Sequence, residues 1–260
     1  MNALIADLSA LLDMSQQAFW LAVLVFIRIG ATVALLPGVG EQSVPARVKI
    51  ALALAFTAVV APAVADGPMA AVGTPGFAAL GAEAVAGLIL GIGLRMFVLV
   101  LQTAASIIAQ ATTLSQLFAG AAPEPQPAIG NLLIIAGLAL ATAAGLHVRA
   151  AELMILSYDL LPPGVLPAPA GVADWGLGLI TSTFSLAFSL AAPFVIASMI
   201  YNLALGAINR AMPQLMVSMV GAPALTLGAL AMLVVATPLL LSVWLAAFSA
   251  HLAQPFVLPP

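Results

Sequence analysis

The chain is short of charge. Only 6% of its 260 residues are Asp, Glu, Lys or Arg, whereas soluble domains carry about 25%. A fold of this size could not cover its surface with so few groups that water solvates well. Hydrophobic residues make up 64% of the chain and the mean hydropathy is +1.22. This composition predicts an integral membrane protein.

Cysteine is absent altogether, which excludes disulfides, thiolate metal sites and cysteine nucleophiles. There is no cluster of Lys and Arg and the net charge is only -3, so nothing favours nucleic-acid binding. The sequence contains no H-E-x-x-H, no G-x-S-x-G and no glycine-rich phosphate loop. We therefore expect neither enzymatic activity nor a cofactor or metal.

Long apolar stretches are what the chain does have, and six of them approach the length of about 20 residues that a membrane span needs. They cover residues 19–36, 50–65, 77 to beyond 106, 129–146, 175–205 and 225–252. The pattern predicts one all-α polytopic domain over residues 1–260. Pro193 and Pro238 lie inside the last two stretches and predict kinks, or breaks into half-helices. The proline-rich residues 160–176 predict an extended surface loop.

Three charged residues interrupt these apolar stretches: Arg28 in the first, Glu83 and Arg95 in the third. The first stretch can still insert, because its eleven Leu, Ile, Phe and Val residues contribute roughly -0.3 to -0.6 kcal/mol each against about +2.5 to +3.5 for one arginine. Glu83 and Arg95 lie about 120° apart around a helix, so they cannot pair with each other. Two interpretations stay open: a substrate or ion pathway, or interhelical salt bridges that fix the packing.

Gly87 and Gly91 form a G-x-x-x-G pair on one helix face, a spacing that lets two helices approach closely. We favour packing within the chain, with a seam to another subunit as the alternative. Farther along, Pro123, Pro125 and Pro127 predict an extended backbone in the segment 112–130. The segment carries an apolar tip, Leu117 and Phe118, and is either an exposed connector or a loop that lines a cavity.

The stretch NRAMPQLMVSMVGAP, residues 209–223, places unusual polar residues between two apolar stretches. Its N-R-x-x-P-Q-L followed by G-x-P resembles the signature of the FliR/SctT family, the R or T subunit of type III export gates. The matching residues are Asn209, Arg210, Pro213, Gln214, Leu215, Gly221 and Pro223. Two further blocks resemble the family, a P-x-R-x-K-I element at residues 45–50 and Glu83 followed by residues 87–95. The chain departs from the family at Met216, where Asn is common, and in residues 112–130, which lack the usual Asp-Pro.

The resemblance implies about six long helices arranged as kinked hairpins, packed into a helical hetero-oligomeric export gate. The protein would be a structural, channel-forming subunit that assembles with P- and Q-type subunits and contacts the B-type switch protein and the A-type export subunit. It would pass unfolded substrates across the bacterial inner membrane, at the flagellar basal body or in the equivalent injectisome. Its intramembrane charges would then face other subunits. From the residues alone, a small-solute secondary transporter is the alternative.

The resemblance also implies two groups of functional residues. Leu117, Phe118 and Gly120 would belong to a loop that projects into the channel and seals it. The 209–223 motif would form a bend and a subunit contact. Within the motif, Met212, Met216 and Met219 share one face if the stretch is helical, and methionine suits a tight but deformable contact. Core packing is the alternative for these methionines.

Overall fold

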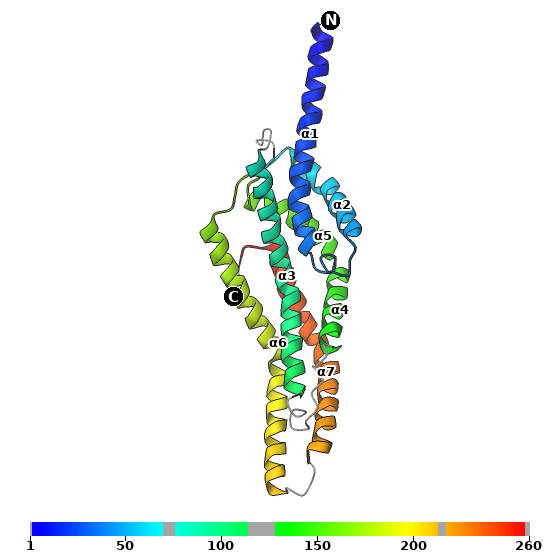
Figure 1. The fold of residues 1–260 in the computed structure, drawn as a ribbon, viewed down its shortest axis with the longest axis vertical. Coiled ribbons are helices and arrows are strands. Elements are labelled where there is room, and N and C mark those ends of the chain that lie inside the picture. Colours follow the sequence, from blue (N-terminus) through cyan, green and yellow to red (C-terminus); the bar gives the residue numbers. More distant parts are fainter. Residues whose placement is uncertain (1, 70–75, 114–127, 213–216, 258–260) are drawn as a thin grey trace. The chain divides into compact units, whose positions relative to one another are not determined.

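The structure is a computed structural model that describes residues 2–69, 76–113, 128–212 and 217–257. In these ranges every regular element is a helix (Figure 1), which confirms the predicted all-α class. The helices are α1 (Asn2–Leu35), α2 (Ala46–Ala65), α3 (Phe77–Thr113), α4 (Ala128–Ala143), α5 (Leu146–Leu160), α6 (Pro169–Ala211) and α7 (Val217–Ala253).

Five of the described helices are long and apolar enough to cross a membrane: α1, α2, α3, α6 and α7. A sixth candidate span is a bent pair, Gly130–Ala143 with Leu146–Leu160, whose axes meet at 73°. The bend falls at Gly145, whose φ of 83° lies in the left-handed region that glycine adopts without a steric penalty. The chain is therefore an all-α polytopic membrane protein with five or six spans.

Helix α5 has no counterpart among the six predicted stretches. His147, Arg149 and Glu152 interrupt its apolar pattern, so no long hydrophobic run marks it. Its buried residues nevertheless recur at helical spacing on one face: Leu146, Ala150, Leu153, Met154, Ser157 and Tyr158. The helix is amphipathic rather than uniformly apolar.

The prolines do not break α6 or α7. Both helices continue through Pro193 and Pro238, so of the two predicted outcomes the half-helices are wrong and the kinks stay a prediction. Residues 160–176 do not form one extended loop, because α6 already begins at Pro169. Proline is well tolerated in the first turn of a helix, where its missing N–H would have no intrahelical partner.

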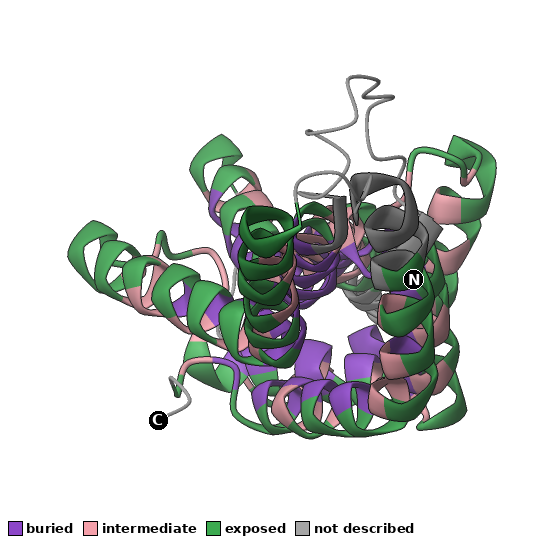
Figure 2. Cartoon of the chain, turned by 90° about the horizontal axis from the view of Figure 1, so that it is seen from below, coloured by how far each residue is buried: buried purple, intermediate pink, exposed green. Residues whose placement is uncertain are grey.

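The chain divides into two compact units. Unit 1 contains Met1–Arg95, Gly145–Leu177 and Ala250–Leu258, and unit 2 contains Met96–Ala144, Gly178–Ser249 and Pro259–Pro260. Helices α3, α6 and α7 each contribute residues to both units. Figure 2 shows that single helices carry buried residues on one side and exposed residues on another.

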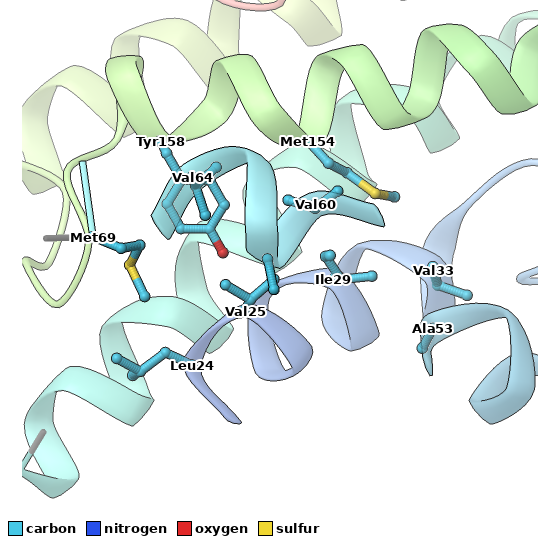
Figure 3. Packing of buried hydrophobic residues seen from close by; sticks show 11 residues of the cluster. Leu24, Val25, Ile29, Val33, Ala53, Val60, Val64, Met69, Met154 and Tyr158 are labelled. Atoms are coloured by element: carbon cyan, nitrogen blue, oxygen red, sulfur yellow. The ribbon is translucent and has the colours of Figure 1, made fainter. Parts of the chain in front are cut away.

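The core of unit 1 is an apolar cluster from α1, α2 and α5 (Figure 3). Helix α1 supplies Val25, Ile29 and Val33 at intervals of four residues, which places them on one face. The remaining members are Leu24, Ala53, Val60, Ala61, Val64, Met69, Met154 and Tyr158. Burial of these side chains holds the three helices together, and it positions Tyr158 next to the charged residues described below.

The G-x-x-x-G pair forms a close seam between α1 and α3 inside unit 1. A Cβ added at Gly87 would collide with the backbone carbonyl oxygen of Arg28 and come within 2.8 Å of the Ala31 Cβ. A Cβ at Gly91 would come within 2.8 Å of the Leu35 Cβ. The Thr32 hydroxyl lies 2.9 Å from the Arg28 carbonyl oxygen of its own helix and 3.1 Å from the Gly87 carbonyl oxygen, so its one hydrogen lies between α1 and α3. These contacts confirm packing within the chain as the role of the glycine pair.

The core of unit 2 is built around Trp244 of α7, which is fully buried. Its indole N–H donates to the Phe97 carbonyl oxygen of α3 at 2.8 Å, and its ring stacks on Phe248 with 5.2 Å between centroids. Gly137 of α4 lies against Leu101 and the Trp244 ring, and a Cβ there would require the end of the Leu101 side chain to shift. The Trp244 ring thus contacts residues of both α3 and α4. Its one polar group, the indole N–H, has a hydrogen-bond partner.

The close packing of α1 against α3 predicts that one added methyl group lowers the stability of the protein at Gly87 but not at Gly81. Gly87→Ala should destabilise the protein by about 1–3 kcal/mol, because the methyl group meets backbone atoms that cannot move aside cheaply. Gly81→Ala on the same helix is the matched control, since a Cβ there meets nothing within 4 Å. Apparent melting temperature in detergent measures both. Equal behaviour of the two variants would contradict the seam.

Candidate functional site

A buried ion pair joins α1 to α3. Arg28 is 1% exposed and Glu83 is 0% exposed. The Arg28 Nε lies 2.7 Å from the Glu83 Oε2, and the Arg28 Nη2 lies 3.1 Å from the Glu83 Oε1. The planar guanidinium therefore binds both carboxylate oxygens at once, the strongest geometry that such a pair adopts.

The other donors of Arg28 bind the end of α5. Nη1 donates to the Ser157 carbonyl oxygen at 3.1 Å and to the Ser157 Oγ at 3.3 Å, and Nη2 donates to the Leu161 carbonyl oxygen at 3.0 Å. Together with the two bonds to Glu83, these contacts employ all five N–H groups of the guanidinium. Its central carbon also lies 3.8 Å from the centroid of the Tyr158 ring, a cation–π contact. Burial of the charge is thus matched by a complete set of partners.

The centre caps α5 and fixes the turn that follows it. The carbonyl groups at a helix C-terminus carry partial negative charge, so a buried arginine is favourable there. Glu83 in turn accepts a hydrogen bond from the Gly164 backbone N–H at 2.8 Å. Gly164 has a φ of 72°, which suits glycine. We name these residues, Arg28, Glu83, Ser157, Tyr158, Leu161 and Gly164, the arginine centre.

The third charge in an apolar segment, Arg95, is held differently. Its Nη1 lies 2.6 Å from the Glu41 Oε1 and its Nη2 lies 3.3 Å from the Glu41 Oε2, with both side chains 28% exposed. Glu41 belongs to the connection between α1 and α2, where Lys49 Nζ also donates to the Gly40 carbonyl oxygen at 3.2 Å. Removing one partner of a pair that water reaches costs much less than removing one partner of a buried pair, because water solvates the charge that remains.

These contacts answer the question that the sequence left open about the charges. Glu83 and Arg95 do not pair with each other, as expected, and each finds a partner from another segment. Interhelical ion pairing, rather than a surface turned toward other subunits, describes Arg28 and Glu83 in this chain. Sequence reasoning missed Glu41 because it lies outside the apolar stretches. It missed Ser157 and Leu161 because their contribution comes mainly from backbone carbonyls, which no residue type reveals.

The residues of the C-terminal motif fall on both sides of a gap in the described chain. Asn209 and Arg210 lie in the last turn of α6 and are exposed, and Met212 directly after it is 57% exposed. Pro213, Gln214, Leu215 and Met216 lie outside the described residues. Met219, Gly221 and Pro223 fall within α7. The subunit-contact role of this motif therefore stays a prediction, as does the gate role of Leu117, Phe118 and Gly120, which also lie outside the described ranges.

The described residues contain no group of three or more His, Asp or Glu side chains that could hold a metal ion. Their buried charges are engaged with each other and with backbone carbonyls. Fold and site together define a class of protein: a polytopic helical membrane protein whose internal charges join helices.

Comparison with known proteins identifies the family. The family described as "Bacterial export proteins, family 1" matches residues 19–251, and the chain belongs to it. The chain is 33% identical over 230 residues to the flagellar biosynthetic protein FliR of Caulobacter vibrioides, covering 86% of this chain and 91% of that protein. It is 29% identical over 212 residues to FliR of Escherichia coli, covering 78% of each chain. FliR of Bacillus subtilis is 28% identical over 206 residues, covering 77% of this chain and 79% of that protein. The resemblance inferred from the motif is confirmed.

The arginine centre predicts strongly coupled effects of mutation. Arg28→Met should destabilise the protein by about 3–5 kcal/mol, because it leaves the Glu83 carboxylate buried without its counter-ion. Combining Arg28→Met with Glu83→Gln should cost less than the sum of the single changes, since the double variant holds no unpaired charge. Melting temperatures of the two single variants and the double variant measure this coupling.

Arg95→Met is the control for that experiment, because it removes an arginine from a pair that is partly exposed to water. We expect a loss of at most about 1 kcal/mol there. Additive effects at Arg28 and Glu83, or equal losses at Arg28 and Arg95, would contradict the account of a buried centre.

Proposed function

We propose that the protein is a structural, channel-forming subunit of the flagellar type III export gate. The observation that carries the proposal is the family match over residues 19–251, together with relatives named flagellar biosynthetic protein FliR that align over more than three quarters of the chain. The family indicates protein export, and the relatives' names favour a flagellar system over an injectisome. The gate would lie in the bacterial inner membrane at the flagellar basal body.

In this proposal the protein works by assembly rather than by chemistry. It joins P- and Q-type subunits, contacts the B-type switch protein and the A-type export subunit, and encloses a path for unfolded substrates. Large apolar side chains on α6 support an extensive contact with lipid or with other helices, because many of them are exposed in the single chain. They include Phe184, Phe188, Met199, Ile200 and Leu203.

A small-solute transporter receives less support from the structure than from the sequence. That interpretation relied on helices broken near the middle of the membrane, which would offer their ends to a substrate. Helices α6 and α7 are continuous through their prolines, and among the described candidate spans only the pair of α4 and α5 is broken, with a bend of 73°. The intramembrane pair of Arg28 and Glu83 is also fully engaged in packing, which leaves it unsuited to binding a solute.

Co-purification tests the proposed assembly. When the chain is expressed with P- and Q-type subunits, we expect a stable complex, and we expect Arg210→Ala to lower its yield severalfold. Arg210 is exposed at the end of α6 within the family motif, so its removal should affect a contact with another subunit more than the chain's own fold. Arg149→Ala, at an exposed position of α5, is the control. A chain that purifies as a monomer and moves a solute in liposomes would refute the proposal.

The gate residues generate a separate expectation. Deleting residues 117–122, which include Leu117, Phe118 and Gly120, should leave assembly intact and make the membrane leak ions, because an apolar tip excludes water. Ion conductance of the reconstituted complex measures the seal. Unchanged conductance in a complex that assembles normally would argue against a sealing loop.

A further inference from the structure

A row of polar side chains follows the second half of α3 in unit 2. Gln102, Ser106 and Gln110 are spaced four residues apart, so they lie along one side of the helix. The opposite side is apolar and buried, with Leu101, Ala104 and Ile108 each at most 2% exposed. We call Gln102, Ser106 and Gln110 the polar row. A row of this kind is unusual in a helix whose candidate span has a mean hydropathy of 2.4.

The polar row borders a cavity of about 340 Å³ within unit 2. Helix α4 supplies Asn131 and Ile134 to the opposite wall, and Ala105 and Ala109 complete the α3 side. Amide and hydroxyl groups at membrane depth are costly in contact with lipid, and such residues typically face the protein interior or a water-filled space. The Ser106 hydroxyl donates to the Gln102 carbonyl oxygen of its own helix at 2.8 Å. The cavity gives the side-chain amides of Gln102 and Asn131 such a space.

The chemistry of this cavity is neutral. Among the described residues of unit 2, Arg210 is the one charged side chain, and it does not line the cavity. Hard cations prefer carboxylates and other oxygen ligands, so a cavity without carboxylates is a poor cation site. Primary amides of Gln and Asn both donate and accept hydrogen bonds. A peptide main chain presents the same two groups at every residue other than proline.

We propose that the polar row and Asn131 contact the main chain of an unfolded polypeptide during export. This inference rests on the proposed function and adds the residues that meet the substrate. The amides replace water as partners of the passing N–H and C=O groups, whatever the side chains of the substrate are. Because the described residues that line the cavity carry no charge, it attracts neither acidic nor basic segments strongly and releases each segment as the next one arrives.

The absence of cysteine makes a direct test practical, because every introduced thiol is the only one in the chain. Gln102→Cys, Ser106→Cys and Asn131→Cys are made separately in cells that lack their own copy of the subunit. An exported flagellar substrate is stalled by a tightly folded C-terminal domain and carries single cysteines along its unfolded segment. Oxidation then joins thiols that meet. Leu132→Cys is the matched control, because Leu132 neighbours Asn131 and is 51% exposed but does not line the cavity.

We expect cross-links from all three test positions to several positions of the stalled substrate, at least tenfold stronger than from Leu132→Cys. If the variants support export but none cross-links above the control, the inference is wrong while the proposed function stands. If a membrane-impermeant maleimide labels the test positions and no substrate cross-link forms, the cavity holds water alone and the inference is also wrong. If the unmodified chain fails to restore export in these cells, the proposed function itself fails.

Discussion

The arrangement of unit 1 depends on one buried guanidinium. Arg28 lies among three helices, and in that apolar setting it is tolerable only because Glu83, Ser157 and Leu161 supply every hydrogen bond it needs. Pairing Arg28 with Glu83 requires α1 and α3 to lie close together, and the glycine pair on α3 permits this close approach. Gly87 lets the backbone of α1 approach α3 closely, one turn from the place where Arg28 meets Glu83. Charge pairing and close packing therefore support each other, and neither is expected to survive without the other.

The sequence predicted part of the fold and part of the arginine centre. The remaining features depend on contacts between helices, which a linear pattern of residues does not show. Composition and apolar runs predicted the membrane class and most spans, and the 209–223 motif predicted the family. Arg28 and Glu83 were recognised as residues that need partners, but their pairing depends on α1 and α3 lying side by side, which helical spacing within one segment cannot show. Helix α5 was missed because its charged residues hide an amphipathic pattern. Pro193 and Pro238 do not divide α6 and α7, because a proline inside a helix removes one backbone hydrogen bond and can leave the others in place.

The two units divide the polar residues of the described chain by kind. Unit 1 holds all the described charged side chains except Arg210, and its two ion pairs, Arg28–Glu83 and Arg95–Glu41, tie segments that are distant in sequence. Unit 2 is nearly free of charge and carries amides and hydroxyls beside a cavity. In the proposed export gate, this division assigns rigid packing to the first unit and contact with the moving substrate to the second.

The measurement that tests the arginine centre most directly is backbone hydrogen exchange at Gly164. Its N–H lies in a non-helical turn, where an amide ordinarily exchanges fast, yet it donates to the buried Glu83 carboxylate at 2.8 Å. In the intact protein we predict strong protection of this amide by mass spectrometry with single-residue resolution, and loss of that protection in Arg28→Met. Exchange of the Gly164 amide at the rate of an unstructured peptide in the unmodified protein would contradict the account.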